Sequence, residues 1–212
     1  MNEFTAALRR AYDEDADRRD RVEPDAWRLA IVDDLAARVL GAGGGDRALE
    51  LGCGTGQLAQ RLGDTGLQVV AVDLSPAMVG RARARGVDAL VADFTRLPFA
   101  DASFDAALAF NSLLHVPQAE LSAAFTEIRR VLAVGGLLTV VRWGGVNRQG
   151  PLPDDDLHPP RFYSTFTDAD LLAQPIPGFT RLSTDVLHEH VNEGVHPQVE
   201  LLVASELPSA ST

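Results

Sequence analysis

Three glycines at alternate positions mark the part of the chain best suited to bind a ligand. Gly52, Gly54 and Gly56 come directly after the apolar segment 48–51, and a helix-compatible segment begins at Gln57. This pattern predicts a strand, a tight turn and a helix. Glycine tolerates positive φ and lets a ligand approach the backbone closely. The turn is therefore a candidate ligand cradle.

The charge around this turn indicates what kind of ligand it binds. A dinucleotide fingerprint requires G-x-G-x-x-G, whereas the third glycine here falls one place early, at Gly56. No Lys or Arg lies between Ala48 and Gln60 to neutralise a phosphate, and Glu50 would repel one. The pattern favours a nucleoside that carries a positive charge and no phosphate.

An ordered series of motifs gives the chain a family resemblance. The segment 50–56 resembles the first motif of class I S-adenosylmethionine-dependent methyltransferases, and the similarity continues in order through 69–78, 91–94, 103–105, 127–132 and Gly135-Gly136. It covers roughly residues 45–143 and is closest to the type 11 group. The resemblance implies S-adenosyl-L-methionine as the cofactor. It also implies a doubly wound α/β fold with a mostly parallel, seven-stranded sheet and an antiparallel last strand beside the fifth.

Acidic residues at the ends of the expected strands belong to the candidate site. In open α/β sheets, ligands bind outside the carboxyl ends of the strands, and Asp73 ends the apolar segment 67–72 at the position that accepts ribose hydroxyls. In the resembled family, an acidic residue at Asp93 bonds the adenine amino group and Phe94 donates a backbone N–H. A turn aspartate is the alternative for Asp93. Met78 either packs on adenine or belongs to the core.

The complete set of expected cofactor contacts extends from the N-terminal arm to the end of the fourth strand, 104–110. Asn111 and Ser112 follow that strand, where turn carbonyls can meet an ammonium group. The expected cofactor-binding residues are Tyr12, Arg28, Glu50, Gly52, Cys53, Gly54, Thr55, Gly56, Asp73, Leu74, Met78, Asp93, Phe94, Asn111 and Ser112.

The N-terminal arm, 1–22, is polar and charged, and it is either a helical or poorly ordered arm or a flap over the ligand. The flap follows from the resemblance, because Tyr12 to Ala16 is similar to a stretch that related enzymes carry. Tyr12 would then offer its hydroxyl to the carboxylate of the ligand. A helix is predicted from Pro24 to Leu40. Arg28, on this helix, either pairs with the same carboxylate or is solvated.

His115 is the candidate catalytic residue, at the place where methyl donor and acceptor should meet. A histidine titrates near neutrality and can take a proton from an acceptor. The alternative is a histidine that packs on the sheet and bonds a backbone carbonyl. Candidate substrate contacts are Trp27, Leu113, Arg142, Trp143, Phe162 and Tyr163. For Trp27 the alternative is an anchor that packs its helix on the sheet.

The remaining segments divide a single expected domain, 1–212. We expect an N-terminal cap and first helix in 1–44, a cofactor-binding core in 45–143, an irregular lid or substrate loop in 144–166, and C-terminal strands in 167–206. The contiguous aspartates 154–156 cannot converge easily on one ion. We therefore expect no metal site.

Composition limits the range of partners. With 19 basic and 30 acidic residues the net charge is −11, which disfavours nucleic acid as a substrate. No signal peptide or run of about 18 apolar residues is present, so we expect a cytoplasmic protein that does not contact a membrane. The oligomeric state is left open.

The expected reaction is methyl transfer to an O or N nucleophile of a small-molecule acceptor, achieved mainly by proximity and in-line orientation. Three alternatives stay open. They are a peptide or protein methyltransferase, a protein of this fold that binds the cofactor without methyl transfer, and a nicotinamide-dependent oxidoreductase. The glycine spacing disfavours the oxidoreductase.

Overall fold

The computed structural model describes residues 3–152, 155–174, 176–191 and 194–205 of the chain. Within them the helices are α1 (Glu3–Arg19), α2 (Ala26–Ala42), α3 (Gln57–Asp64), α4 (Pro76–Ala84), α5 (Leu121–Val131) and α6 (Asp168–Ala173), with short 3-10 turns η1 (Leu113–His115) and η2 (Gln118–Glu120). The strands are β1 (Arg47–Leu51), β2 (Gln68–Asp73), β3 (Asp88–Val91), β4 (Phe104–Phe110), β5 (Leu132–Trp143), β6 (Arg148–Pro151), β7 (Phe162–Thr165), β8 (Phe179–Val191) and β9 (Gly194–Ser205).

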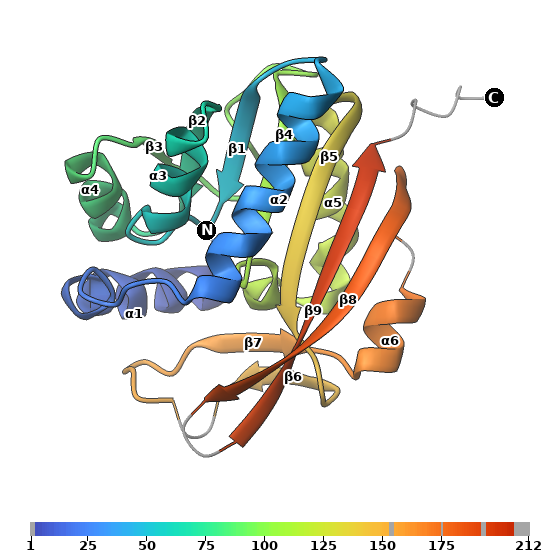
Figure 1. The fold of residues 1–212 in the computed structure, drawn as a ribbon. Helices are drawn as coiled ribbons and strands as arrows, with labels where there is room; N and C mark the ends of the chain where they lie inside the picture. The colour runs from blue at the N-terminus through green and yellow to red at the C-terminus, as the bar shows by residue number, and fades with distance from the viewer. Residues whose placement is uncertain (1–2, 153–154, 175, 192–193, 206–212) are drawn as a thin grey trace.

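Seven strands form one sheet in the order β3-β2-β1-β4-β5-β9-β8 (Figure 1). Strands β1 to β5 pair in parallel, and β9 runs antiparallel between β5 and β8. This arrangement confirms the predicted fold, including the antiparallel last strand beside the fifth. Leu51 lies opposite Val72, and Asp73 lies opposite Val91. The carboxyl ends of β1, β2 and β3 are therefore level at one edge of the sheet.

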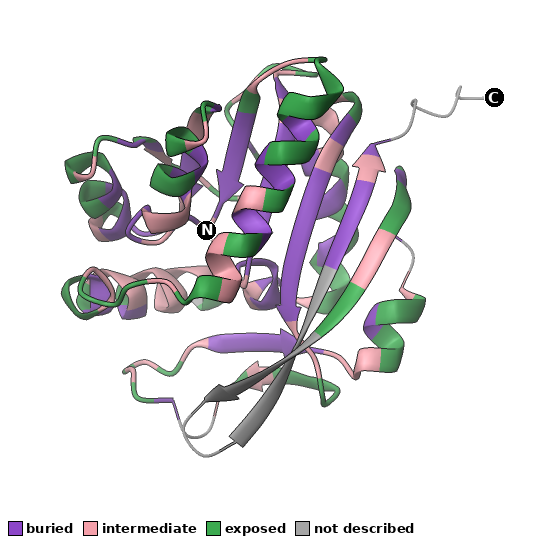
Figure 2. Ribbon diagram, viewed as in Figure 1, coloured by how far each residue is buried: buried purple, intermediate pink, exposed green. Residues whose placement is uncertain are grey.

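Helices cover both faces of the sheet, because the central strands are apolar on both sides. Helices α2, α3 and α4 supply Leu35, Leu62 and Val79 to clusters on one face. Helix α5 supplies Ile128 and α6 supplies Leu171 to the cluster on the other face. Figure 2 shows the resulting continuous buried layer through the middle of the sheet. No helix among the described residues is both long and apolar enough to cross a bilayer.

Local signals fix several helix ends. The Ser75 side chain accepts a hydrogen bond from Met78 N at 3.1 Å, and Pro76 opens α4. The helix predicted from Pro24 begins two residues later, at Ala26. A 3-10 turn precedes α5, and Leu132 already pairs with Phe104 in the sheet.

Two further elements lie beneath the carboxyl edge of the sheet (Figure 1). Helix α1 crosses at the lower left of this view, and the β6–β7 hairpin lies below it, toward the centre. The sequence predicted an irregular lid or substrate loop over 144–166, whereas β6 pairs with β7 through Arg148 opposite Thr165 and Pro151 opposite Phe162. Ligands of open α/β sheets bind at this edge. Helix α1 and the β6–β7 hairpin therefore cover the edge at which a ligand would bind.

Candidate active site

The glycine turn opens onto a cavity at Gly54. A side-chain carbon built at Gly54, where φ is +53°, would meet no atom within 4 Å. At Gly56 the same carbon would lie 2.7 Å from Ala82 Cβ of α4. Gly54 thus leaves space for a ligand, whereas Gly56 permits the close packing of α3 against α4. Gly56 is not among the residues that border the cavity.

Asp73 connects the glycine turn to the end of β2. Its Oδ2 accepts a hydrogen bond from Gly54 N at 2.8 Å, and its Oδ1 accepts one from Ser75 N at 2.9 Å. Burial raises the pKa of Asp73, and these two backbone donors oppose that shift. The carboxylate holds the turn in place and also borders the cavity.

Glu50 is a buried acid at the end of β1. Only 2% of the residue is exposed, and its Oε2 has no hydrogen-bond partner among the described residues. Burial, together with the negative charge of Asp73, raises the pKa of Glu50 to about 8. Ser112 Oγ, at the end of β4, is a second buried oxygen without such a partner. Unpartnered acceptors on a cavity wall suit a ligand that donates hydrogen bonds and carries positive charge.

The ends of β3 and β4 supply the next part of the wall. Asp93 Oδ1 accepts hydrogen bonds from Thr95 N at 2.9 Å and from Thr95 Oγ1 at 2.8 Å, so a turn aspartate describes its local geometry. It also borders the cavity with Phe94. Asn111 has a positive φ of 50° and donates its backbone N–H to Val141 O at 2.9 Å.

Helix α1 is fastened over the cavity at the start of α4. Asp13 Oδ1 accepts hydrogen bonds from Ser75 Oγ at 2.5 Å and from Ala77 N at 3.1 Å. Gln57 Nε2 donates to Val22 O at 2.7 Å, which holds the segment after α1 against α3. The N-terminal arm is therefore a helix seated across the ends of β1 and β2.

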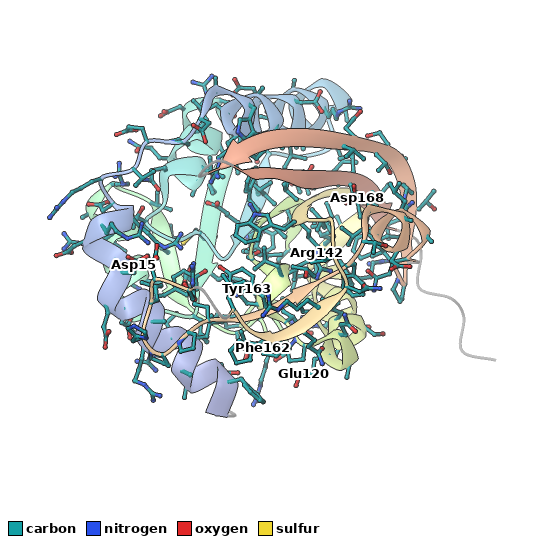
Figure 3. All side chains as sticks on the ribbon, turned by 90° about the horizontal axis from the view of Figure 1, so that it is seen from below. Asp15, Glu120, Arg142, Phe162, Tyr163 and Asp168 are labelled. Atoms are coloured by element: carbon teal, nitrogen blue, oxygen red, sulfur yellow. The ribbon has the colours of Figure 1, made fainter. Side chains whose placement is uncertain are left out.

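The C-terminal part of α1 is organised by Asp15 (Figure 3). This carboxylate is 5% exposed and accepts hydrogen bonds from Arg18 Nε at 2.6 Å and from Arg19 Nε at 2.7 Å. The Arg19 guanidinium lies 4.8 Å from the centre of the Tyr12 ring. Asp15 thus places two arginines on the cavity wall, and Arg19 in turn packs on Tyr12.

His115 joins α1 to β7. Its Nδ1 lies 2.7 Å from Phe162 O and its Nε2 lies 2.6 Å from Tyr12 Oη. Because a carbonyl oxygen can only accept, Nδ1 carries the hydrogen and Nε2 accepts from the Tyr12 hydroxyl. Burial lowers the pKa of His115 to about 3. The ring is neutral, both of its nitrogens are engaged, and the Tyr12 O–H points to His115.

These elements enclose a cavity of about 680 Å³. Every expected cofactor residue except Gly56 borders it, and so does His115. Sequence reasoning missed part of the wall, above all the residues of α1 and of the segment that follows η1. The missed residues are Thr5, Leu8, Arg18, Arg19, Val22, Glu23, Pro24, Asp25, Gln57, Leu58, Ala92, Thr95, Phe110, Val116, Pro117 and Glu120. The helical spacing of Thr5, Leu8 and Tyr12 is a signal that would have found the α1 contribution.

The six expected substrate residues do not border this cavity. Trp143 stacks on Tyr163 with ring centres 5.3 Å apart, and Tyr163 meets the edge of the His115 ring at 4.8 Å. Figure 3 shows Phe162 and Tyr163 on β7, close to Arg142. These side chains form a layer behind His115.

The other three members of that set are also packed into the protein. Arg142 Nη2 donates to Ser164 O at 2.9 Å, and burial lowers the pKa of Arg142 to about 10. Trp27 packs on Phe110 with ring centres 5.4 Å apart, as its anchoring alternative predicted. Leu113 is fully buried.

Comparison with known proteins agrees with this geometry. A family model described as a methyltransferase domain matches residues 49–140. Residues 49–140 of this chain are therefore similar to a methyltransferase domain. A demethylmenaquinone methyltransferase of Beutenbergia cavernae is 43% identical over 119 residues, which are 55% of this chain and 47% of that protein. The chain therefore aligns with about half the length of this relative.

Two solved structures share this fold, and their names state different reactions. The Burkholderia thailandensis 1,6-didemethyltoxoflavin-N1-methyltransferase, solved with that compound and S-adenosylhomocysteine, gives a TM-score of 0.72 at 21% identity, covering 96% of this chain and 89% of that one. The [4+2]-cyclase SpnF gives a TM-score of 0.66 at 24% identity, covering 89% of this chain and 85% of that one. At these identities the likeness concerns the fold alone.

Proposed function

We propose that this protein transfers a methyl group from S-adenosylmethionine to a nucleophilic atom of a small molecule. The observation that carries the proposal is the cavity beside Gly54, whose inner wall holds the carboxyl groups of Glu50 and Asp73. The arginines that border this cavity come from α1 and α2 and not from the glycine turn. This wall suits a cationic nucleoside and repels phosphate.

The residues around the cavity fit the parts of this cofactor. We assign Asp73 to the ribose hydroxyls, Asp93 and the Phe94 backbone to adenine, and Glu50 with the turn at Asn111 and Ser112 to the positively charged end. Arg19 and Arg28, which border the same cavity, are the cationic groups available to a carboxylate. When bound, S-adenosylmethionine supplies a methyl group on a positively charged sulfur, which is already an activated donor.

The protein's own task is then to orient the acceptor and exclude water. Positioning of this kind can lower a barrier by about 7–11 kcal/mol. The engaged nitrogens of His115 support a positioning role, in which it holds Tyr12 and β7 over the cavity, in place of the general-base role. Helix α1 across the cavity favours a small acceptor over a peptide or protein, and the net charge of −11 argues against nucleic acid.

Calorimetric titration with S-adenosylhomocysteine tests the cofactor assignment, with NADH as the control ligand. Mass spectrometry after incubation with S-adenosylmethionine and candidate acceptors tests the reaction, through a gain of one methyl group. Uptake of NADH without uptake of S-adenosylhomocysteine would overturn the proposal.

A second function has one observation in its favour. The fold is shared with SpnF, a [4+2]-cyclase. A protein that binds the cofactor without methyl transfer would bind S-adenosylhomocysteine and leave every acceptor of a broad panel unmethylated.

A further inference from the structure

Glu50 is a buried acid of the cavity wall, and one of its carboxyl oxygens has no hydrogen-bond partner among the described residues. Its backbone pairs with Ala71 of β2 on one side and Leu108 of β4 on the other, in the middle of the sheet. The side chain is 2% exposed, and Oε2 has no hydrogen-bond partner among the described residues. The residue nevertheless borders the ligand cavity. A ligand can therefore reach a carboxyl group that bulk water scarcely touches.

The groups facing Glu50 give a negative charge little support. The carboxylate of Asp73, on β2, and the thiol of Cys53, in the glycine turn, both lie near Glu50. The backbone N–H of Ala59, in the first turn of α3, donates the one hydrogen bond that favours the charged form. From α1 and α2, Arg19 and Arg28 border the same cavity, and they form ion pairs with Asp15 and Asp25.

Comparison with Asp73 decides which of the two acids carries a proton. Asp73 accepts a backbone N–H on each of its carboxylate oxygens, from Gly54 and from Ser75. Glu50 has one such bond and one bare oxygen. Hydrogen bonds to the charged form favour ionisation, and a neighbouring like charge opposes it. Burial raises the pKa of both acids, and the hydrogen bonds from Ser75 and Gly54 oppose that shift at Asp73. A negative charge is therefore better supported on Asp73 than on Glu50.

We propose that Glu50 is a proton-linked specificity residue, which is neutral in the ligand-free protein at pH 7 and ionises when a ligand places a positive charge beside its bare oxygen. In this step the O–H bond of the Glu50 carboxyl breaks and the proton passes to the buffer. The inference rests on the proposed function, since it takes the ligand to be the cationic nucleoside assigned above.

The coupling between ligand binding and proton release from Glu50 has two measurable consequences. Ligand binding at pH 7 should release about one proton per site, and the affinity should rise about tenfold per pH unit between pH 6 and 7 and level off above pH 8. A ligand with the same nucleoside and no ammonium group should leave Glu50 protonated. For that ligand, we expect no proton release and an affinity that does not change with pH.

The experiment is isothermal titration of the full chain with S-adenosylhomocysteine and with 5′-methylthioadenosine, which lacks the ammonium group. Each titration is run at pH 7 in phosphate and in Tris, because the difference in heat between buffers of unlike ionisation enthalpy reports the number of protons released. Glu50→Gln keeps the size and shape of the side chain and should abolish the release. Glu120→Gln, which removes an exposed carboxylate from the rim of the same cavity, should retain it.

The outcomes separate the two proposals. Binding of S-adenosylhomocysteine by the wild-type protein with equal heats in the two buffers overturns the Glu50 inference and leaves the proposed function standing. Proton release that persists in a folded Glu50→Gln variant also overturns it. Failure of the wild-type protein to bind S-adenosylhomocysteine at any pH overturns the proposed function itself. The pH series on the wild-type protein decides the matter even where the variant does not fold.

Discussion

Asp73 has two tasks in the structure, and its replacement should reveal both. Asp73→Ala removes two hydrogen bonds to backbone N–H groups of the glycine turn and of the start of α4. We expect S-adenosylhomocysteine to bind more weakly by about 1–3 kcal/mol, since charge-assisted hydrogen bonds are lost. Calorimetry measures the change. Asp88→Ala, at an exposed position at the start of β3, is the matched control, and equal affinity in the two variants would contradict the assignment.

His115 should remain neutral throughout the range in which an ordinary histidine titrates. Its Nδ1–H donates to Phe162 O, its Nε2 accepts from Tyr12, and burial lowers its pKa to about 3. The ¹⁵N NMR signals of the His115 ring should therefore stay those of a single neutral tautomer from pH 8 to pH 5. Tyr12→Phe should shift the Nε2 signal alone. Protonation of the wild-type ring near pH 6 would refute this description.

Sequence spacing predicted cavity residues that local geometry places, and it gave no information on side chains that long-range packing places. Gly54 and Asp73 are fixed by a strand, a turn and the next strand, all of which follow from apolar segments and glycines. Trp143 and Tyr163 were expected at the substrate, but they stack on each other from β5 and β7. Nothing in the spacing of two distant aromatics shows whether they meet a ligand or each other.

At the scale of elements, α1 should act as a cap whose attachment controls ligand release. Asp13 accepts hydrogen bonds from Ser75 Oγ and Ala77 N, where the positive end of the α4 dipole adds to their strength. Asp13→Ala should lower the free energy of unfolding by about 1–2 kcal/mol, speed the dissociation of S-adenosylhomocysteine and increase hydrogen exchange in α1.

Asp17→Ala is the control for this prediction. It removes an exposed ion pair between the same two helices, to Arg81, and such pairs contribute less than about 1 kcal/mol. Dissociation rates that are the same in the Asp13 variant and in the wild-type protein would mean that α1 does not limit ligand exit.

Elements with local signals were predictable, and the β6–β7 hairpin was not. The bounds of β4 agree with the sequence prediction, and α4 begins at a local cap formed by Ser75 and Pro76. The hairpin joins Arg148–Pro151 to Phe162–Thr165 across ten intervening residues. Neither a short turn nor alternating apolar residues in β6 indicates this pairing. Its register depends on contacts beneath the sheet, such as Arg142 Nη2 to Ser164 O.

At the scale of the whole molecule, two of the buried titratable groups, Glu50 and His115, should oppose each other in the pH dependence of stability. The pKa of Glu50 is raised to about 8, so its contribution is complete below the unfolded value of 4.5 and is lost as the pH rises toward 8. The pKa of His115 is lowered to about 3, so its contribution is complete above the unfolded value of 6.5 and is lost as the pH falls. The two slopes oppose each other between 4.5 and 6.5.

Glu50 alone of these two groups acts between pH 6.5 and 8, and its effect can be isolated there. The free energy of unfolding of the ligand-free protein should fall over this range by about 1–2 kcal/mol, since each pH unit is worth at most about 1.4 kcal/mol per group. Urea denaturation at several pH values measures it. The slope should vanish in Glu50→Gln and persist in Glu120→Gln. Saturating S-adenosylhomocysteine should also remove the slope, because a ligand that binds the ionised carboxylate offsets the loss of stability at higher pH. A free energy of unfolding that does not change with pH in the wild-type protein would show that burial does not hold the proton on Glu50.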